Sequence, residues 1–421
     1  MKAESRLDPI RAIEDKLLLH TYERTPLLFV GGHDVYLEDE HGEEYLDLLS
    51  GIGVSALGYS HPVIEQAIAA QSKKLLHTSN LFFHEYTAEL ALRLTEISGL
   101  DRVFLCNSGT EAWEAALKLA RAHGERDRTH GGKLGTKFLA LEHSFHGRTM
   151  GSVATTHKER YRLPFAPVMP AVEFVRFNDV EDLCAKFDDE VCGICVESIQ
   201  GEGGIHPLSQ EFFATARELC DRSGALLIAD EIQCGFGRTG TWFAYQQFGI
   251  LPDVTTIAKP LAGGLPIGAM LANERAAAAF APGMHGTTFG GNPLACAVAI
   301  AVVDEIKRAH LLEHIQQVGD YFLAQLRSLA ERHNGIRDVR GKGLMIGLEL
   351  RSQELAIEVA AEMLERRILL NRTSETVLRF LPPYLLERKH VDLAVSALDS
   401  ILASKDSSAA PATAGVSSHE H

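Results

Sequence analysis

The middle of the chain alternates short runs of apolar and β-branched residues with segments of helical periodicity. This alternation predicts a mostly parallel sheet covered by helices, which is the α/β class of fold. In open sheets of this class, ligands bind beyond the C-terminal ends of the strands. Residues with chemical character gather at those ends, so we expect the functional site there. The candidate strands are residues 102–106, 137–142, 172–177, 191–197, 225–229 and 254–258.

Both ends of the chain have a different pattern. They contain a predicted hairpin of residues 34–39 and 44–48 around His41-Gly42, a helical pattern from residue 293 to about 334, and strand character at 344–350 and 377–381. We expect residues 1–60 and 306–404 to form one small α+β domain beside a large domain of residues 61–305. The Ser- and Ala-rich segment 405–421 has no core pattern and is expected to be disordered.

Composition excludes several classes of function. A formal net charge of −15 argues against a nucleic-acid partner, because a protein that binds phosphate backbones normally has a basic face. No apolar run is long enough to cross a bilayer, and the first residues lack the apolar core of a signal peptide. We therefore expect a cytoplasmic protein with no membrane partner.

The sequence does not favour a metal site. Seven cysteines in a long chain fit reduced thiols better than a disulfide framework. Cys192 and Cys195 lie three apart in a predicted strand, where they point to opposite faces. His143 and His146 have no third ligand nearby in the sequence. We therefore expect no bound metal.

Lys259 and Asp230 follow two apolar strands, 254–258 and 225–229. A lysine at the mouth of a buried strand loses water, and this favours the neutral amine that forms Schiff bases with aldehydes. The 29 residues between the two positions (259 − 230 = 29) leave room for one helix and a strand return, which places both side chains at neighbouring strand ends. An Asp and Lys pair of this kind is what pyridoxal phosphate (PLP) requires.

Two Gly/Thr-rich turns are candidate anion sites. Ser108, Gly109 and Thr110 join a strand to a helix, where unpaired backbone N–H groups and the helix dipole can bind a phosphate, or where Ser108 is simply a helix cap. Thr287 and Thr288 lie in the second turn, whose hydroxyl and N–H groups suit another phosphate contact or a substrate carboxylate.

Charged and aromatic side chains near the other strand ends suggest substrate contacts. Arg148 can bind a carboxylate with two hydrogen bonds, or it forms a surface salt bridge. Arg379 lies in an apolar run and therefore needs an anionic partner. Glu197 and Glu202 flank a flexible turn and either pair with an amine or an arginine, or are solvated loop acids.

Phe145 and Gln233 complete the set of candidates. Phe145 follows the strand that ends near residue 142, so its ring stacks on a planar cofactor or belongs to the core. Gln233 lies three residues after Asp230 and can hydrogen-bond a ring oxygen.

With these residues in place, the chain resembles the class III (fold type I) PLP-dependent aminotransferases over residues 22–402, and it is most similar to the acetylornithine aminotransferases among them. The shared motifs are residues 107–112, 145–149, 200–204, 230–233, 259–264 and 288–293. The resemblance implies a large domain with a seven-stranded, mostly parallel sheet and a small domain built from both ends of the chain.

The resemblance also assigns roles in cofactor binding. It implies that PLP is attached covalently to Lys259, which then moves a proton between the substrate Cα and the cofactor. Asp230 would form an ion pair with the pyridine nitrogen, Gln233 would contact the ring oxygen and Phe145 would stack on the ring.

Phosphate binding is assigned to two subunits. Gly109 and Thr110, next to the candidate Ser108, would bind the phosphate within one chain. Thr288 would reach the phosphate of the neighbouring subunit, with Thr287 near the substrate. A homodimer with shared active sites is therefore implied.

For the substrates, the resemblance implies that Arg148 binds the carboxylate of acetylornithine and Arg379 that of the keto acid. Glu197 would cover Arg379 while the amino donor is bound. One departure from the family is Ser198, where proline is more usual, and this change could loosen the turn that aims Glu197.

The expected reaction is ping-pong transfer of the terminal amino group of N2-acetyl-L-ornithine to 2-oxoglutarate, which gives N-acetyl-L-glutamate 5-semialdehyde and L-glutamate, in arginine biosynthesis. The alternatives are class III enzymes acting on ornithine, succinylornithine, succinyldiaminopimelate, carrier-bound lysine or 4-aminobutyrate, or an aminomutase or racemase on the same fold. A dinucleotide oxidoreductase is disfavoured because no G-x-G-x-x-G turn follows a strand.

Overall fold

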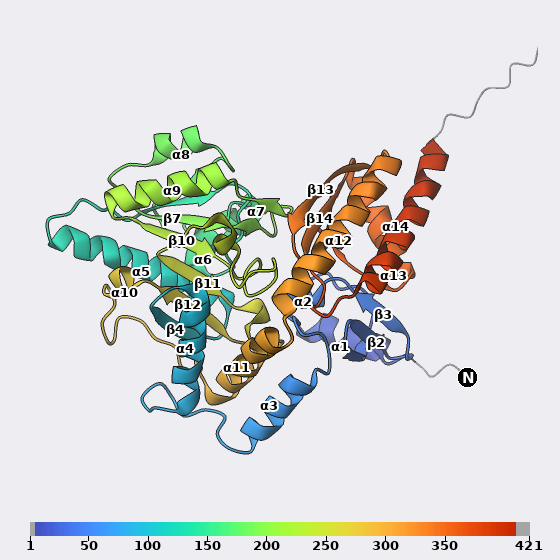
Figure 1. Cartoon of the computed structure of the whole chain (residues 1–421), viewed down its shortest axis with the longest axis horizontal. Coiled ribbons are helices and arrows are strands. Elements are labelled where there is room, and N and C mark those ends of the chain that lie inside the picture. The colour runs from blue at the N-terminus through green and yellow to red at the C-terminus, as the bar shows by residue number, and fades with distance from the viewer. Residues whose placement is uncertain (1–4, 410–421) are drawn as a thin grey trace, which may run out of the picture.

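A computed structural model describes residues 5–409. Its centre is a seven-stranded sheet in the order β4-β12-β11-β10-β7-β5-β6, in agreement with the expected fold class (Figure 1). The strands of this sheet are β4 (Arg102–Cys106), β12 (Gly268–Ala272), β11 (Val254–Ile257), β10 (Leu226–Asp230), β7 (Val191–Glu197), β5 (Lys137–Leu141) and β6 (Val172–Val175). The six strands expected from the sequence are all present. The sequence did not indicate β12, which is antiparallel to both neighbours.

The large sheet is buried on both faces, and this explains its apolar strands. In β10, Leu226 and Ile228 pack with helix α5 (Gly109–Thr129), while Leu227 and Ala229 pack on the opposite side with helix α9 (Gln210–Ser223). Successive side chains of a strand point to opposite faces, so this alternation follows from strand geometry. Continuous apolar runs are typical of such doubly covered parallel strands.

Helices connect and cover the strands. The remaining helices are α1 (Leu7–Leu17), α2 (Ser50–Gly53), α3 (Pro62–Ser72), α4 (Glu85–Ser98), α6 (Met150–Ala154), α7 (Glu159–Arg162), α8 (Val180–Lys186), α10 (Glu274–Ala277), α11 (Pro293–Arg308), α12 (Leu311–Arg332), α13 (Gln353–Glu365) and α14 (Arg388–Ala409). The single helical pattern expected from residue 293 is divided between α11 and α12. The division falls at His310, whose φ of 51° is left-handed and ends the regular helix. Within the described residues, no helix is long and apolar enough to cross a membrane.

Two smaller sheets come from the ends of the chain. One has the order β1-β2-β3-β15 and the other the order β13-β14-β17-β16. Their strands are β1 (Phe29–His33), β2 (Tyr36–Asp39), β3 (Glu44–Asp47), β15 (Ile368–Leu369), β13 (Ile336–Lys342), β14 (Met345–Leu350), β17 (Val377–Phe380) and β16 (Asn371–Thr373), and a separate short pair is β8 (Ile199–Gln200) with β9 (His206–Pro207). The expected hairpin is confirmed, because β2 and β3 pair antiparallel. Parallel pairing of β15 with β3 joins the two ends of the chain in one sheet.

The expectation of disorder from residue 405 is wrong at its start. Residues 405–409 continue helix α14. Lys405 contributes to this extension, because its amine lies 2.8 Å from carboxylate oxygens of both Glu358 and Glu362 on helix α13. The remaining residues of that segment, 410–421, lie outside the described residues.

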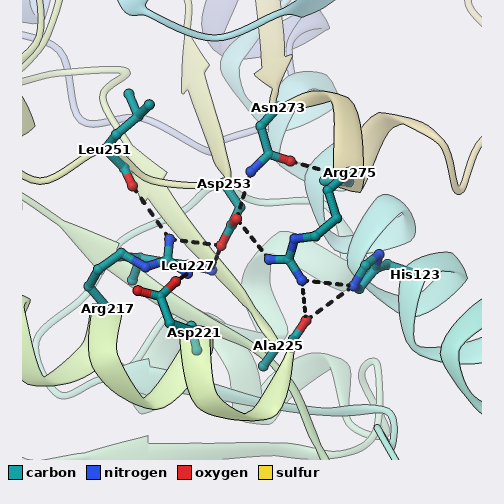
Figure 2. Close-up of polar contacts among 12 residues, drawn as sticks. His123, Arg217, Asp221, Ala225, Leu227, Leu251, Asp253, Asn273 and Arg275 are labelled. Atoms are coloured by element: carbon teal, nitrogen blue, oxygen red, sulfur yellow. Dashed lines mark hydrogen bonds and ion pairs between the residues drawn. The ribbon is translucent and has the colours of Figure 1, made fainter. Parts of the chain in front are cut away.

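A buried acid, Asp253, holds together the N-terminal ends of the central strands β10 and β11. These ends are opposite to the C-terminal ends that lead to the candidate site residues. Asp253 precedes β11 and accepts hydrogen bonds from the guanidinium of Arg275 at 2.8 Å, the amide of Asn273 at 2.7 Å and the backbone N–H of Leu227 at 2.9 Å (Figure 2). Arg217 of α9 forms an ion pair with it at 2.9 Å. These contacts hold the starts of β10 and β11 together, and the opposite ends of the same strands lead to Asp230 and Lys259.

Candidate active site

A cavity of about 200 Å³ lies at the C-terminal ends of β7, β10 and β11. It is lined by Gly109, Thr110, Phe145, His146, Gly147, Glu197, Ile199, Glu202, Asp230, Ile232, Gln233, Cys234, Ala258 and Lys259. Eight of the residues selected from the sequence are in this lining: Gly109, Thr110, Phe145, Glu197, Glu202, Asp230, Gln233 and Lys259. Ser108, Arg148, Thr287, Thr288 and Arg379 are outside it.

Asp230 ends β10 and is held by its neighbours. One carboxylate oxygen accepts the backbone N–H of Ile232 at 3.0 Å, and the other lies 2.7 Å from Nδ1 of His146. His146 is buried and stacks on Trp113 with ring centroids 4.0 Å apart and an interplanar angle of 6°. The carboxylate is therefore fixed in direction, as an acid must be to hold a ring nitrogen.

Lys259 follows β11 after a single residue, Ala258, and begins a short 3₁₀ turn. Thr256 of β11 pairs with Asp230 of β10, so the lysine and the aspartate leave neighbouring strand ends, as expected. Burial lowers the pKa of the Lys259 amine below its ordinary value. Within the described residues, Nζ of Lys259 has no hydrogen bond or ion pair. This amine is therefore available as a nucleophile or base.

The N-terminus of α5 forms another side of the cavity. Ser108 caps the helix, because its hydroxyl accepts the backbone N–H of Glu111 at 3.3 Å. The backbone N–H groups of Gly109 and Thr110 precede the first intrahelical bonds and remain for an anion. A Cβ at Gly109 would lie 2.9 Å from Cδ1 of Ile232, so the close approach at this point suits glycine.

Arg379 has the anionic partner that its burial requires, but the partner differs from the one expected. Its guanidinium is fully buried in β17 and donates to the carboxylate of Glu202 at 2.5 Å and to the amide oxygen of Gln233 at 3.1 Å. Glu197 does not contact Arg379 in this structure. Both oxygens of Glu197 instead accept backbone N–H groups, from Phe145 at 3.0 Å and Gly201 at 3.1 Å.

The two acids consequently differ in ionisation. Burial raises the pKa of Glu197 to about 7, because no cation pairs with its carboxylate among the described residues. Burial also acts on Glu202, but the charge and hydrogen bond of Arg379 hold its pKa below the ordinary value. Glu202 is therefore an anion at neutral pH, and it forms a closed pair with Arg379 at the cavity wall.

Other candidates lie at or beyond the rim. Arg148 is exposed, and its guanidinium carbon lies 3.6 Å from the ring centroid of Tyr161 and 5.6 Å from that of Phe145. Thr288 is exposed as well. Thr287 lies against Asn107, whose amide donates to the threonine hydroxyl at 3.0 Å. The turn with Thr287 and Thr288 therefore does not reach the cavity of its own chain.

Sequence reasoning missed two features of the site. His146 was weighed only as a metal ligand, and its contact with Asp230 depends on the stacking with Trp113, which no local pattern indicates. Glu202 was considered as a carboxylate that pairs with an amine or an arginine, or as a solvated loop acid, but Arg379 was not assigned to it. Its position in the Gly-rich turn that follows β7 and β8 was the available signal. Within the described residues, no group of three or more His, Cys, Asp or Glu side chains is arranged to hold a metal ion.

Comparison with known proteins agrees with the arrangement of Lys259 and Asp230 in the cavity. The family model described as aminotransferase class-III matches residues 19–402. Acetylornithine aminotransferases from Methanocaldococcus jannaschii and Aquifex aeolicus are 43% and 45% identical to the chain; the alignments cover 92% and 91% of this chain and 96% and 99% of those proteins.

Solved structures of aminotransferases share the fold. Ornithine aminotransferase from Toxoplasma gondii superposes with a TM-score of 0.91 at 30% identity, covering 96% of both chains. Acetylornithine aminotransferase from Elizabethkingia anophelis gives a TM-score of 0.83 at 29% identity, covering 95% of this chain and 100% of the other. A PLP-bound amine transaminase from an uncultivated Pseudomonas species gives 0.85 at 29% identity, with 92% and 98% covered.

A seven-stranded sheet with one antiparallel strand, and a lysine and an aspartate at adjacent strand ends, define the fold type I class of PLP-dependent enzymes. Within that class, the chain belongs to the class III aminotransferases. The family and its PLP-bound structural neighbour imply PLP as the cofactor.

Proposed function

We propose that the protein transfers the terminal amino group of N2-acetyl-L-ornithine to 2-oxoglutarate, with PLP bound covalently to Lys259, in arginine biosynthesis. Support for this donor comes from the acetylornithine aminotransferases, which are 43–45% identical over nine-tenths of the chain. Support for the site comes from Lys259, Asp230 and Glu202, which line one cavity, and from the pairing of Glu202 with Arg379 at its wall. This shared cavity is the observation on which the proposal chiefly rests.

The lining residues fit PLP in charge and order. The helix N-terminus at Gly109 and Thr110 suits the phosphate, and the carboxylate of Asp230 suits a protonated ring nitrogen. Phe145 and Gln233 line the same space and would contact the ring and its oxygen. Lys259 opens onto this space with a lowered pKa. Bound PLP would supply the electron sink that stabilises negative charge on a substrate carbon.

The remaining chemistry falls to side chains of this chain. Lys259 Nζ would take the proton from the substrate carbon that bears the reacting amine and deliver it to the former aldehyde carbon of the cofactor, which requires the lysine amine to be neutral near pH 7. His146 would keep the Asp230 carboxylate turned toward the ring nitrogen through its 2.7 Å contact. Arg148 would bind the donor carboxylate at the rim.

Alternation between the two substrates requires a switch in charge. While Glu202 covers Arg379, the wall of the cavity is neutral and accepts the side chain of an amino donor. The second carboxylate of 2-oxoglutarate would displace Glu202 and bind Arg379, because both substrates use the same cavity in turn. We propose Glu202, in place of Glu197, for this role.

A homodimer would complete the site. Leu81, Phe82 and Phe83 are exposed by 85%, 67% and 105%, and Phe289, next to Thr288, is exposed by 62%. Asn80 connects the two segments by donating to the carbonyl oxygens of Thr287 and Gly290, at 3.1 Å each. So large an apolar surface favours burial against a second copy, which would bring Thr288 to the partner's phosphate site.

Absorbance spectroscopy tests the proposed reaction. The purified protein is expected to be yellow, to lose the colour when N-acetylornithine is added and to regain it with 2-oxoglutarate. A protein that takes up no PLP, or keeps its colour with every acylated amine, would contradict the proposal. Recovery without added keto acid would instead indicate an aminomutase or racemase.

A further inference from the structure

Arg238 is a buried cation that has no part in the chemistry proposed above. It lies in the loop of residues 231–240 that follows β10, and its side chain is fully buried. Among residues 5–409, no carboxylate forms an ion pair with its guanidinium. A buried guanidinium without a counter-ion is costly, so its hydrogen bonds must compensate. The positions of the acceptors therefore indicate what this residue holds in place.

The acceptors of Arg238 lie at one end of the small sheet that contains β17. Nη1 donates to the carbonyl oxygen of Leu344 at 3.2 Å and also to that of Pro382. Leu344 comes directly before β14, and Pro382 comes two residues after the end of β17. The backbone adds another bond, because the carbonyl oxygen of Arg238 accepts the N–H of Leu344 at 3.0 Å. One residue thus ties together the ends of two neighbouring strands.

These strand ends are close to Arg379. β14 and β17 pair antiparallel, with Gly347 opposite Arg379. Pro382 is three residues beyond Arg379 in the chain. A strand rises by about 3.3 Å per residue and is stiff over so short a length, so a displacement of the end of β17 would move the guanidinium of Arg379 as well.

The loop that carries Arg238 begins at the candidate cofactor site. Asp230 ends β10 immediately before the loop, and Gln233 within the loop accepts a hydrogen bond from Arg379 at 3.1 Å. The loop therefore connects the acid that would hold the cofactor ring with the strand that carries Arg379. The contacts of Arg238 set the distance between them.

This distance matters for only one of the two substrates in the proposed function. 2-Oxoglutarate and its product L-glutamate carry a second carboxylate at a fixed distance from the reacting carbon. A guanidinium binds a carboxylate through directed hydrogen bonds, which weaken steeply when distance and angle change. The acylated donor binds through Arg148 and makes no use of Arg379.

Resting on the proposed function, we propose that Arg238 is a positioning residue that holds β17 where Arg379 meets the second carboxylate of 2-oxoglutarate or L-glutamate. Arg238 itself does not touch the substrate. Its loss should weaken the reaction with the dicarboxylic substrates and spare the reaction with the acylated donor.

Stopped-flow absorbance tests this difference, because L-glutamate and N-acetylornithine react with the same PLP-loaded form of the enzyme. Arg238→Met keeps an unbranched side chain but removes every donor. The concentration of L-glutamate that gives half the maximal rate of colour loss should rise about tenfold, as for the weakening of a hydrogen bond to a charged group. The concentration of N-acetylornithine that gives half its maximal rate should not change. Arg238→Lys retains a cationic donor and should show a smaller rise for L-glutamate.

Binding of glutarate provides a readout without turnover. Glutarate has both carboxylates but no reacting amine, and titration calorimetry should show that it binds about tenfold more weakly to Arg238→Met than to the unchanged protein.

Gln316→Ala is the matched control. The amide of Gln316, on α12, donates to the carbonyl oxygen of Gly240 in the same loop at 2.6 Å, but this bond does not join the loop to β14 or β17. The variant should respond to L-glutamate, N-acetylornithine and glutarate as the unchanged protein does. If Arg238→Met does not fold, the comparison of Arg238→Lys with Gln316→Ala decides.

The outcomes separate this inference from the proposed function. Equal losses with L-glutamate and N-acetylornithine, or an unchanged response to L-glutamate, would overturn the positioning role of Arg238. If the unchanged protein reacts with L-glutamate but not with N-acetylornithine, the proposed donor is wrong, and a weaker response to L-glutamate in the Arg238 variants but not in Gln316→Ala still supports the positioning role. An unchanged protein that does not react with L-glutamate would overturn both.

Discussion

Glu202 is the residue whose role the structure changes most. Replacement by Gln keeps its shape but removes the charge that neutralises Arg379. We expect Glu202→Gln to lower the KM for 2-oxoglutarate about tenfold, because the guanidinium is then open to the incoming carboxylate. The half-reaction with the amino donor should slow. Stopped-flow absorbance measures the two half-reactions separately.

Glu197→Gln provides the matched comparison. Its carboxylate accepts backbone N–H groups and does not contact Arg379. The substitution Glu197→Gln should therefore not lower the KM for 2-oxoglutarate. If Glu197→Gln, and not Glu202→Gln, produced the lower KM, the assignment made from the sequence would be right and the one made here wrong.

Ser198 has a structural role that its departure from the family pattern did not suggest. Its hydroxyl donates to the carboxylate of Glu231 at 2.5 Å, and burial raises the pKa of Glu231 to about 7. The hydroxyl stabilises the ionised acid, so its removal raises this pKa further. Ser198→Ala should cost about 1–2 kcal/mol of unfolding free energy at pH 8. At pH 6, where Glu231 is mostly protonated in the folded state, the loss should be smaller.

Denaturant unfolding at the two pH values checks this sign. A folded-state pKa above the unfolded value means that Glu231 itself opposes folding as pH rises. A loss that is equal at both pH values, or larger at pH 6, would show that Ser198 does not act through the ionised carboxylate.

At the level of single residues, the sequence placed many of the chemical groups at the cavity but did not always predict what they contact. Lys259 and Asp230 were placed correctly because strand ends of a parallel sheet are fixed by local pattern. The partner of Arg379 was not, because a side-chain pair between β17 and a distant turn is decided by packing. His146 was missed for the same reason.

Among the structural elements, the buried Asp253 cluster determines how β10 and β11 are aligned (Figure 2). Asp253→Asn leaves Arg217 and Arg275 without their shared anion and should lower the free energy of unfolding by about 3 kcal/mol. Burial would raise the pKa of Asp253, but Arg217 and Arg275 hold it below the ordinary value. Its contribution is therefore present above about pH 4 and lost as pH falls through the folded-state pKa.

A surface variant controls for the loss of charge. Asp221 also forms an ion pair with Arg217, at 2.8 Å, but its side chain is 64% exposed. Asp221→Asn should cost less than about 1 kcal/mol. Chemical denaturation at pH 7 and at pH 3.5 measures the free energy of unfolding of both variants. Equal losses of unfolding free energy at pH 7, or a difference between the variants that grows at pH 3.5, would contradict this role for Asp253.

Helices and strands could be predicted where a short stretch of sequence carries their hydrophobic pattern. Strands with continuous apolar runs were found within a residue or two. Strand β12, residues 268–272, escaped because Gly-Ala-Met-Leu-Ala has few β-branched residues and its antiparallel pairing needs no crossover helix. The break at His310 escaped because the apolar periodicity continues on both sides of it.

For the whole molecule, the exposed segment between α3 and α4 predicts how copies assemble. Phe83→Asp places a charge in the proposed dimer surface and should shift the protein toward monomer, with at least a tenfold loss of activity because Thr288 no longer reaches the partner's site. Light scattering coupled to gel filtration measures the mass. Leu393→Asp changes another exposed apolar residue, on α14, and should leave both mass and activity unchanged. An active Phe83→Asp monomer would contradict a shared site.

The proposed chemistry depends above all on the attachment of PLP to Lys259, which lies beyond the end of β11 opposite the Asp253 cluster. Borohydride reduction of the PLP-loaded protein, followed by peptide mapping, tests it most directly. We predict that the reduced cofactor is found on the peptide containing Lys259. Its attachment to any other lysine, or to none, would contradict the central claim.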